Sequence, residues 1–342
     1  MTDRLCLTSL TLSELEGYLQ KIGEKPFRAR QIFQGIYQRG LTDFSGFTDL
    51  PLALRQKLSE KFIINPLAIE QTASSADGTV KYLFRLPDGF YVETVLIPSG
   101  QRRTVCLSTQ VGCKFRCAFC ASGLNGFRRN LRPGEIVSQV LSLKYLFGHQ
   151  ITNLVFMGMG EPLDNLENVL KAIRILNDEQ GLNFGARRMT VSTAGVIPGI
   201  RQLKNFELQI NLSISLHSSI DRQRSQLMPI NKKYPLPELV AAAEDYIRSG
   251  GRQLTLEYIL IKDLNDSLYE AEGLAAIARR LRAKVNLIAY SPVAGLPYLR
   301  PTTEDLSRFQ RWLEERKIKV TVRQSKGVDI AAACGQLAGK FQ

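Results

Sequence analysis

The sequence predicts an α/β fold: an incomplete TIM-like barrel of six β/α units that follows a small helical domain. Two observations support this prediction. From about residue 104, short apolar segments alternate with amphipathic segments of helical length. Several of the short segments, such as residues 153–157, are apolar almost throughout, which is typical of parallel strands covered by helices. In such a barrel the active site lies at the carboxyl ends of the strands.

A helical accessory domain is predicted over residues 1–64. Ser13 is a candidate N-cap for a first helix that ends at Gly23, residues 27–37 have the spacing of an amphipathic helix, and a third helix follows Pro51. Basic side chains are frequent here, and they suit an RNA backbone and an ordinary solvated surface equally well. They are Lys21, Lys25, Arg28, Arg30, Arg39, Arg55, Lys57 and Lys61.

A β-hairpin extension is predicted over residues 65–98. Its two strands, residues 80–86 and 90–97, flank the turn sequence Pro-Asp-Gly. Glu93 lies in the second strand, where its position alone favours a solvent-facing side chain.

The barrel core is predicted over residues 99–329, and an irregular tail, residues 330–342, carries Cys334. The apolar segments predict strands at 104–108, 153–158, 189–194, 208–216, 255–261, 284–290 and 319–323. The amphipathic segments between them predict helices at 134–147, 165–179, 235–249, 268–281 and 303–316.

Composition and charge restrict the partners and the compartment. The 342 residues carry a net charge of +13 and have a pI of about 9.5, which favours an anionic partner, with nucleic acid as the first candidate. Neither a signal peptide nor an apolar run long enough to span a membrane is evident. We therefore expect a cytoplasmic protein, in which the six cysteines are reduced and favour metal or redox chemistry over structural disulfides.

Three cysteines, Cys113, Cys117 and Cys120, follow the first barrel strand with the spacing C-x3-C-x2-C. Thiolates this close on one loop suit a single metal centre, and iron–sulfur clusters are held by cysteines at such spacings, usually four of them. With three ligands, one iron of a cube stays open to a non-protein ligand, much as a catalytic zinc keeps an open position. An open iron at a strand end indicates chemistry rather than electron storage.

A structural zinc site is the weaker alternative for these cysteines. It needs a fourth ligand, and neither His149 nor His217 is spaced to provide one. A group of unreactive core cysteines is weaker still, because Lys114 and Arg116 interleave the three thiols and favour thiolates.

The cysteine motif, with Phe119 before its last cysteine, resembles that of the radical S-adenosylmethionine (SAM) superfamily. The sequences Ser-Thr-Gln-Val-Gly-Cys at 108–113 and Cys-Ala-Phe-Cys-Ala-Ser-Gly at 117–123 are similar to one branch of it, the radical SAM RNA methyltransferases. These methylate an adenine ring carbon in 23S rRNA and, in most members, also in tRNA. The similarity extends over nearly the whole chain, so it implies a radical SAM barrel and favours an RNA-binding role for residues 1–64.

The resemblance implies that SAM is bound at the ends of several strands. The segment Gly-Met-Gly-Glu-Pro-Leu at 158–163 looks like the one that holds the SAM amino group, although by itself it would be a turn. Ser192 and His217 would by themselves be strand caps, and Ser291 stands where the family usually has the longer Asn. The implied SAM contacts are Gly160, Glu161, Ser192, Ser215, Leu216, His217 and Ser291.

Three further residues take catalytic roles by resemblance. Cys334, in the string Ala-Cys-Gly-Gln-Leu, carries the methyl group, although by itself it would pass as a buried small hydrophobe. A 5′-deoxyadenosyl radical formed from a second SAM activates that methyl group, which adds to the adenine ring, and Glu93 removes the ring proton. Cys106 then forms a transient disulfide with Cys334 and releases the product.

The resemblance therefore implies an RNA (adenine-C2) methyltransferase that acts on 23S rRNA and on an adenosine next to the anticodon of tRNAs, with a 4Fe–4S cluster and SAM as cofactors. The expected partners are these RNAs and an electron donor such as flavodoxin or ferredoxin, with no membrane and with the protein as a monomer. Two alternatives stay open. One is methylation of C8 of the same rRNA adenosine, the sister activity that confers antibiotic resistance. The other is a non-catalytic iron–sulfur protein that binds RNA.

Overall fold

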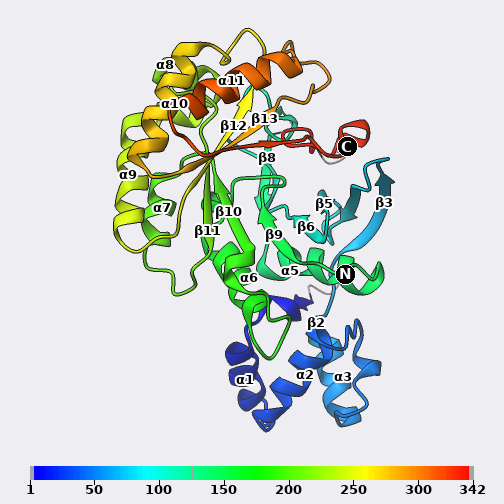
Figure 1. The fold of residues 1–342 in the computed structure, drawn as a ribbon. Helices are drawn as coiled ribbons and strands as arrows, with labels where there is room; N and C mark the ends of the chain where they lie inside the picture. Colours follow the sequence, from blue (N-terminus) through cyan, green and yellow to red (C-terminus); the bar gives the residue numbers. More distant parts are fainter. Residues whose placement is uncertain (1–3, 125, 339–342) are drawn as a thin grey trace.

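Ten strands form one continuous sheet at the centre of the protein, shown here as a computed structural model that describes residues 4–124 and 126–338 (Figure 1). Seven of the ten are parallel and lie in chain order across the sheet. They are β6 (Arg102–Cys106), β9 (Asn153–Phe156), β10 (Met189–Thr193), β11 (Asn211–Ser215), β12 (Thr255–Leu260), β13 (Lys284–Ala289) and β14 (Val320–Arg323). Each lies close to its predicted range. Because β14 is an edge of the sheet, the barrel is open, and the predicted incomplete barrel is confirmed.

Helices cover the outer side of the parallel strands (Figure 1). Two of them, α7 (Ile197–Leu203) and α8 (Asp221–Leu227), are absent from the prediction, because seven residues make barely two helical turns and show no clear period. The predicted helix 134–147 is α5 followed by a π-helical turn, η3 (Ser142–Leu146). The predicted barrel helices are present as α5 (Pro133–Leu141), α6 (Leu166–Asn177), α9 (Leu236–Arg248), α10 (Leu268–Arg280) and α11 (Thr303–Glu315).

Three antiparallel strands extend the same sheet beyond β6. The predicted hairpin corresponds to β4 and β5, whereas β3 is absent from the prediction, because its side chains are mostly exposed and do not alternate. In the register of β5 and β6, Val95 lies opposite Cys106, so Glu93 is on the same face of the sheet as Cys106. The three strands are β3 (Ala68–Ser74), β4 (Val80–Arg85) and β5 (Tyr91–Ser99).

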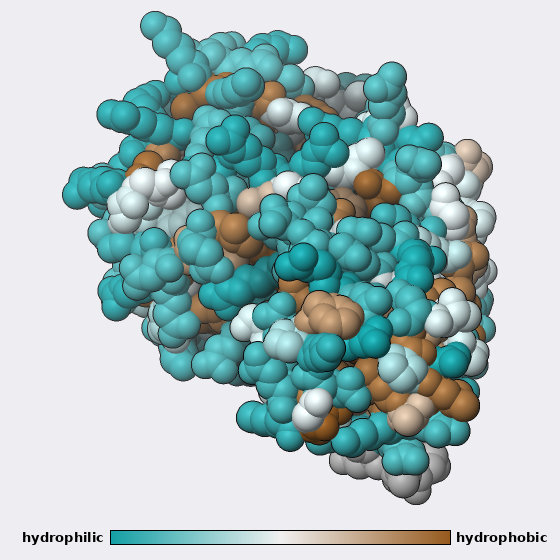
Figure 2. Space-filling model, turned by 90° about the horizontal axis from the view of Figure 1, so that it is seen from below, coloured by the Kyte–Doolittle hydropathy of each residue, from teal (hydrophilic) through white to brown (hydrophobic). Residues whose placement is uncertain are grey.

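The N-terminal region lies at the bottom of Figure 1 and contains the three predicted helices. The N-cap of the first helix is Thr11 rather than Ser13, because Thr11 and Glu14 form a capping box. The surface seen from this end is mainly hydrophilic, with separate hydrophobic patches (Figure 2). The elements of the region are α1 (Leu12–Lys21), α2 (Phe27–Tyr37), α3 (Leu52–Lys61) and the parallel pair β1 (Leu5–Cys6) and β2 (Phe62–Ile63).

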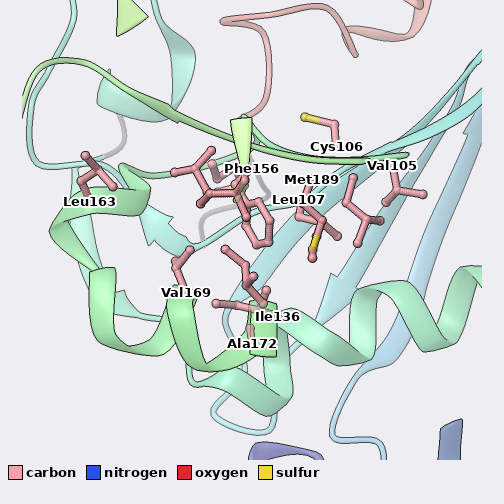
Figure 3. Close-up of a cluster of buried hydrophobic side chains, with 14 of the residues drawn as sticks. Val105, Cys106, Leu107, Ile136, Phe156, Leu163, Val169, Ala172 and Met189 are labelled. Carbon is pink, nitrogen blue, oxygen red and sulfur yellow. The ribbon is translucent and has the colours of Figure 1, made fainter. Parts of the chain in front are cut away.

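The two faces of the parallel strands meet different surroundings. The apolar side chains of Leu107 and Phe156 point towards α5 and α6, from which Ile136 and Val169 pack against them (Figure 3). The Cys106 sulfur points the opposite way, away from these helices (Figure 3). The outer face therefore builds the core, and the inner face is left for the site. No helix in the described part of the chain combines the length and the hydropathy needed to cross a bilayer.

Gln139 of α5 joins the antiparallel and parallel parts of the sheet. Its Oε1 accepts hydrogen bonds from Thr94 Oγ1 (2.7 Å) and Ser108 N (2.9 Å), and its Nε2 donates to Ser108 O (2.9 Å). We expect Gln139→Leu to lower the free energy of unfolding by about 2–4 kcal/mol, because three buried polar groups lose their partner. Urea denaturation would measure this loss.

Gln202→Leu on α7 is the matched control, since Gln202 is exposed. We expect it to change the free energy of unfolding by less than about 0.5 kcal/mol. Equal losses in the two variants would contradict a structural role for the Gln139 hydrogen bonds.

Candidate active site

The carboxyl ends of the parallel strands surround two adjoining cavities. The first cavity is lined by the three motif cysteines and by residues at the ends of β9, β10 and β11 and just after them. The second cavity is lined by Cys106 and by residues of β14 and the segment after it. Their shared wall consists of Cys120, Ser122, Met157, Gly158, Ile288, Cys334 and Gly335.

The structure brings most of the predicted site residues together. Leu216 and Ser291 are buried and do not appear among the described residues that line either cavity, and Ser291 accepts a hydrogen bond from Arg300. Their roles stay predictions. The predicted residues that line the first cavity are Cys113, Cys117, Cys120, Gly160, Glu161, Ser192, Ser215, His217 and Cys334.

A short hairpin holds the cysteine loop in place. Its strands, β7 (Gln110–Gly112) and β8 (Phe127–Asn130), are antiparallel and flank the loop, and Cys113 N donates a hydrogen bond to Gly126 O (3.1 Å). Gly112 has a φ of +72°, and a Cβ atom there would lie 1.7 Å from Gly126 O. Only glycine fits this position, so the local backbone fixes where the cysteine loop begins.

The cysteines of the loop are partly buried, and the burial of their thiols raises the pKa of all three, that of Cys113 to about 12. The support expected from neighbouring cations is not found, because Lys114 pairs with Asp164 and Arg116 is exposed. A buried cation from elsewhere, Arg224, lowers the pKa of Cys117 against the larger effect of burial. Deprotonation of these thiols is therefore coupled to the binding of a metal centre.

The donor set fits an iron–sulfur cube better than a single ion. Thiolates on one zinc ion all lie about 2.3 Å from it, whereas in a cube each thiolate binds a different iron, so the sulfurs lie farther apart. Among the residues that the structure describes, no three His, Cys, Asp or Glu side chains are arranged to hold one metal ion. Three thiols that line one cavity are the ligand set that the three-cysteine motif predicts for a 4Fe–4S cluster.

The sequence does not reveal the residue that organises this end of the barrel, Arg224 of α8. Its side chain is completely buried, and its guanidinium donates hydrogen bonds to Ala194 O (2.7 Å), Ser215 O (3.0 Å) and Leu216 O (3.0 Å). It thereby holds together the segments at the ends of β10 and β11. Nη1 also donates to Asn231 Oδ1 (2.6 Å). The nearest sequence signal is the string Met-Pro-Ile-Asn that contains Asn231, which shows nothing of these contacts.

Glu161 is a buried carboxylate in the first cavity. It accepts hydrogen bonds from Leu163 N (3.0 Å) and Ala194 N (2.7 Å), and burial raises its pKa to about 7. The preceding Gly160 has a φ of +97°, and a Cβ atom there would lie 2.4 Å from Gln110. The segment therefore approaches the cavity in a conformation that needs glycine, and it presents a carboxylate suited to an ammonium group.

His217 is neutral. Its Nδ1 accepts a hydrogen bond from Ile259 N (3.0 Å), and burial lowers its pKa to about 3, so the proton is on Nε2. Its ring stands edge-on to Phe119, with the centroids 5.0 Å apart. Ser192 and Ser215 lie nearby on adjacent strands, with their hydroxyl oxygens 3.5 Å apart. These groups offer uncharged hydrogen bonds to a ligand.

Glu257 of β12 also lines the first cavity, and the sequence pattern does not single it out. Its Oε1 accepts hydrogen bonds from Ser213 Oγ (3.2 Å) and Asn286 Nδ2 (3.0 Å). Its Oε2 has no hydrogen-bond partner in the described parts of the chain, and Arg323 lies 4.0 Å away. In the sequence, a glutamate within a run of apolar residues resembles part of a core strand. Only the assembled barrel shows that Glu257 lines the cavity.

Cys106 and Cys334 come from distant parts of the chain and line the same cavity as free thiols. Cys334 lies in the tail after β14, and its exposed surface faces the cavities. Burial and, to a lesser extent, the nearby Cys334 raise the pKa of Cys106 to about 12. Burial also raises the pKa of Cys334, and Arg323 lowers the pKa of both thiols.

Glu93 is buried beside the tail rather than solvent-facing. Its Oε1 pairs with Lys81 Nζ (3.0 Å) and its Oε2 accepts a hydrogen bond from Ala338 N (2.8 Å). It is not among the described residues that line the two cavities. The structure therefore places Glu93 on the face of Cys106 and against the tail that carries Cys334.

An open barrel whose strand ends hold a three-cysteine loop and a glycine-lined cavity defines a radical SAM enzyme. Residues 107–272 match the Radical SAM superfamily, and residues 6–64 match the Ribosomal RNA large subunit methyltransferase N-terminal domain. The crystal structure of a radical SAM methyltransferase from Sphaerobacter thermophilus superposes with a TM-score of 0.95 at 45% identity, covering 98% of this chain and 100% of that chain.

Curated relatives identify the family of radical SAM enzymes to which the chain belongs. The dual-specificity RNA methyltransferase RlmN of a Nitratiruptor species is 44% identical over 98% of this chain and 98% of its own. The probable dual-specificity RNA methyltransferase RlmN of Geobacillus kaustophilus is 46% identical over 97% of this chain and 92% of its own. The chain therefore belongs to the RlmN family of radical SAM RNA methyltransferases. Its cofactors are a 4Fe–4S cluster and SAM.

The raised pKa of Glu161 makes stability depend on pH. Its pKa is about 7 in the folded protein and about 4.5 when unperturbed, so between these values the folded state keeps a proton that the unfolded state releases. Stability from this group is therefore lost as pH rises through that window. Relative to Glu161→Gln, we expect wild type to lose roughly 3 kcal/mol between about pH 4.5 and about pH 7.

Urea denaturation of both proteins at a series of pH values would measure this difference. The altered hydrogen bonds to Leu163 and Ala194 change the free energy of unfolding of the variant by the same amount at every pH. Only the pH dependence of the difference between the two proteins is therefore informative. A difference that stays constant across the window would contradict the assignment.

Proposed function

We propose that this protein methylates C2 of an adenosine in 23S rRNA and of an adenosine next to the anticodon in tRNAs. The observation that carries the proposal is the position of Cys334. It lines both the cavity with the cysteine loop and the cavity with Cys106. A thiol placed in this way can accept a methyl group on one side and deliver it on the other.

The residues of the first cavity suit the bound groups. Cys113, Cys117 and Cys120 would hold the cluster, and the Glu161 carboxylate would accept the SAM amino group. Ser192, Ser215 and the Nε2 proton of His217 would add hydrogen bonds, and the predicted contacts of Gly160, Leu216 and Ser291 belong to the same proposal. When bound, these groups supply the methyl group and the radical that activates it.

The chain's own residues carry out the remaining steps. Cys334 holds the methyl group as a thioether and presents it to the adenine. Glu93 accepts the proton that the ring carbon loses. The Cys106 thiolate then attacks the Cys334 sulfur. The transient disulfide forms as the bond between that sulfur and the transferred carbon breaks, and the carbon takes the electron pair and a proton to become the methyl group of the product. Both thiols must ionise for their roles, and Arg323 is a cation that favours this against their burial.

RNA is the substrate class that the surface supports. Several of the basic residues singled out in the N-terminal helices are exposed, including Lys21, Arg30 and Lys57, and cations of this kind hold a phosphate backbone. We assign the region to RNA binding on this basis. An electron donor such as flavodoxin or ferredoxin, a monomeric state and a cytoplasmic location complete the proposal.

The direct test is mass spectrometry of nucleosides from unmodified rRNA and tRNA after incubation with anaerobically reconstituted protein, SAM and a reductant. We expect 2-methyladenosine from both RNAs. 8-Methyladenosine would replace the proposed position by the sister activity. No methylated adenosine, with the cluster intact, would overturn the proposal in favour of a non-catalytic RNA-binding protein.

Cysteine variants test the residue roles in the same assay. We expect Cys334→Ala and Cys106→Ala each to lower product formation by at least about a thousandfold, because each removes a covalent step. Cys6→Ala is the matched control, since Cys6 is buried against Thr8 and Ile64 in the N-terminal region. Full activity of either barrel variant would contradict the assigned role.

A further inference from the structure

The tail that carries Cys334 is fastened on two sides. On one side, Ala121 N donates a hydrogen bond to Gly335 O (2.7 Å), and Ser122 Oγ donates to Leu337 O (2.5 Å). Ala121 and Ser122 directly follow the last cysteine of the loop. These contacts hold the described part of the tail, residues 330–338, against the wall of the first cavity. They involve tail carbonyls only, so they do not depend on the tail side chains.

On the other side, the tail is held by the antiparallel extension. Lys81 Nζ donates a hydrogen bond to Ala331 O (3.1 Å), and the Glu93 carboxylate accepts one from Ala338 N (2.8 Å). Lys81 and Glu93 are themselves joined, with Nζ 3.0 Å from Oε1. The ion pair of Lys81 and Glu93 therefore contacts the tail at Ala331, three residues before Cys334, and at Ala338, four residues after it.

The bridge between Lys81 and Glu93 is largely buried. The side chains are 16% and 8% exposed, respectively. In the strand register Lys81 lies opposite Val95, which in turn lies opposite Cys106, so Lys81, Glu93 and Cys106 share one face of the sheet. Removing one charge of a buried pair leaves the other uncompensated, so the position of each side chain depends on its partner.

We propose that Lys81 is a positioning residue for the methyl transfer: it holds the tail so that Cys334 faces Cys106, and it orients Glu93. This inference rests on the roles proposed above for Cys334 and Glu93. Glu93 meets the tail rather than the cavities, so Ala338 must move before Glu93 can reach a base. Lys81 keeps the carboxylate in place when Ala338 moves, because its amine contacts Glu93 independently of Ala338.

The test measures the rate at which Cys106 and Cys334 form a disulfide in the full-length protein after addition of diamide, a mild oxidant. This rate reports how often the tail brings the two sulfurs together, and it needs neither RNA nor the action of Glu93. We expect Lys81→Met to slow it by at least about tenfold. Lys81→Arg can still reach Ala331 O and Glu93 Oε1. We therefore expect the rate of disulfide formation in this variant to be within about threefold of the wild-type rate.

Two further variants keep the result interpretable. Arg85→Met removes a cation from the same strand, where Arg85 lies 3.9 Å from Glu70 at the surface, and should leave the rate unchanged. The double variant K81M/E93Q leaves no unpaired buried charge, so it should fold even if Lys81→Met does not, and it should show the same slow rate. A wild-type rate in the double variant would overturn the proposal.

The same variants separate this inference from the proposed function. Normal disulfide rates in every Lys81 variant, with 2-methyladenosine still formed, would remove the role of Lys81 and leave the methyltransferase standing. Slow disulfide formation in the Lys81 variants, with no methylated adenosine formed even by the wild type, would support tail positioning and overturn the proposed function. With both proposals correct, Lys81→Met should also lower the fraction of methylated Cys334, measured by mass spectrometry, by at least about tenfold.

Discussion

The parallel direction of seven neighbouring strands is the constraint on which the site depends. Parallel strands end at one edge of a sheet, so segments far apart in the chain meet there without any contact specific to them. Glu161, Ser192 and His217 lie at or just beyond the ends of three successive strands, and they line one cavity for this reason. The strand ends still need to be held, and the buried Arg224 does so with hydrogen bonds to carbonyls after β10 and β11.

The antiparallel strands add what the parallel strands cannot supply. Because β5 pairs with β6, Glu93 and Cys106 share one face of the sheet. The tail leaves β14 at the opposite edge of the parallel strands and crosses to this extension, as Figure 1 shows for the segment that ends near β5. Cys334 is thereby carried from one edge of the barrel to the other. The three groups proposed to act on the RNA base are thus brought together by one antiparallel pairing and one crossing segment.

Local patterns predict much of this fold but little of how the site is supported. The long helices were predictable because burial of one face imposes a period on the sequence, and the barrel strands because burial of both faces makes short segments apolar almost throughout. The exposed strand β3 and the short helices α7 and α8 carry no such period. Another reason explains why no sequence pattern identified Arg224, Glu257 or Lys81. Each is a polar residue whose partners lie on other elements, and nothing in the neighbouring sequence indicates that it is buried. The three cysteines of the loop were identifiable from their spacing, whereas Glu93, Cys106, Cys334 and the SAM contacts were identifiable only because they resemble residues of a family.

The difference between neighbours in the sequence and neighbours in the fold also explains which cations lower the pKa values of the thiols. The cations beside the cysteine motif in the sequence, Lys114 and Arg116, were expected to favour thiolates, yet they face Asp164 and solvent. The cations that lower the thiol pKa values are Arg224 for Cys117 and Arg323 for Cys106 and Cys334. A site that excludes water raises the pKa of every thiol it contains. The compensating charges here come from buried or strand-borne groups. The barrel strands and α8 provide such groups, Arg323 on β14 and Arg224 on α8.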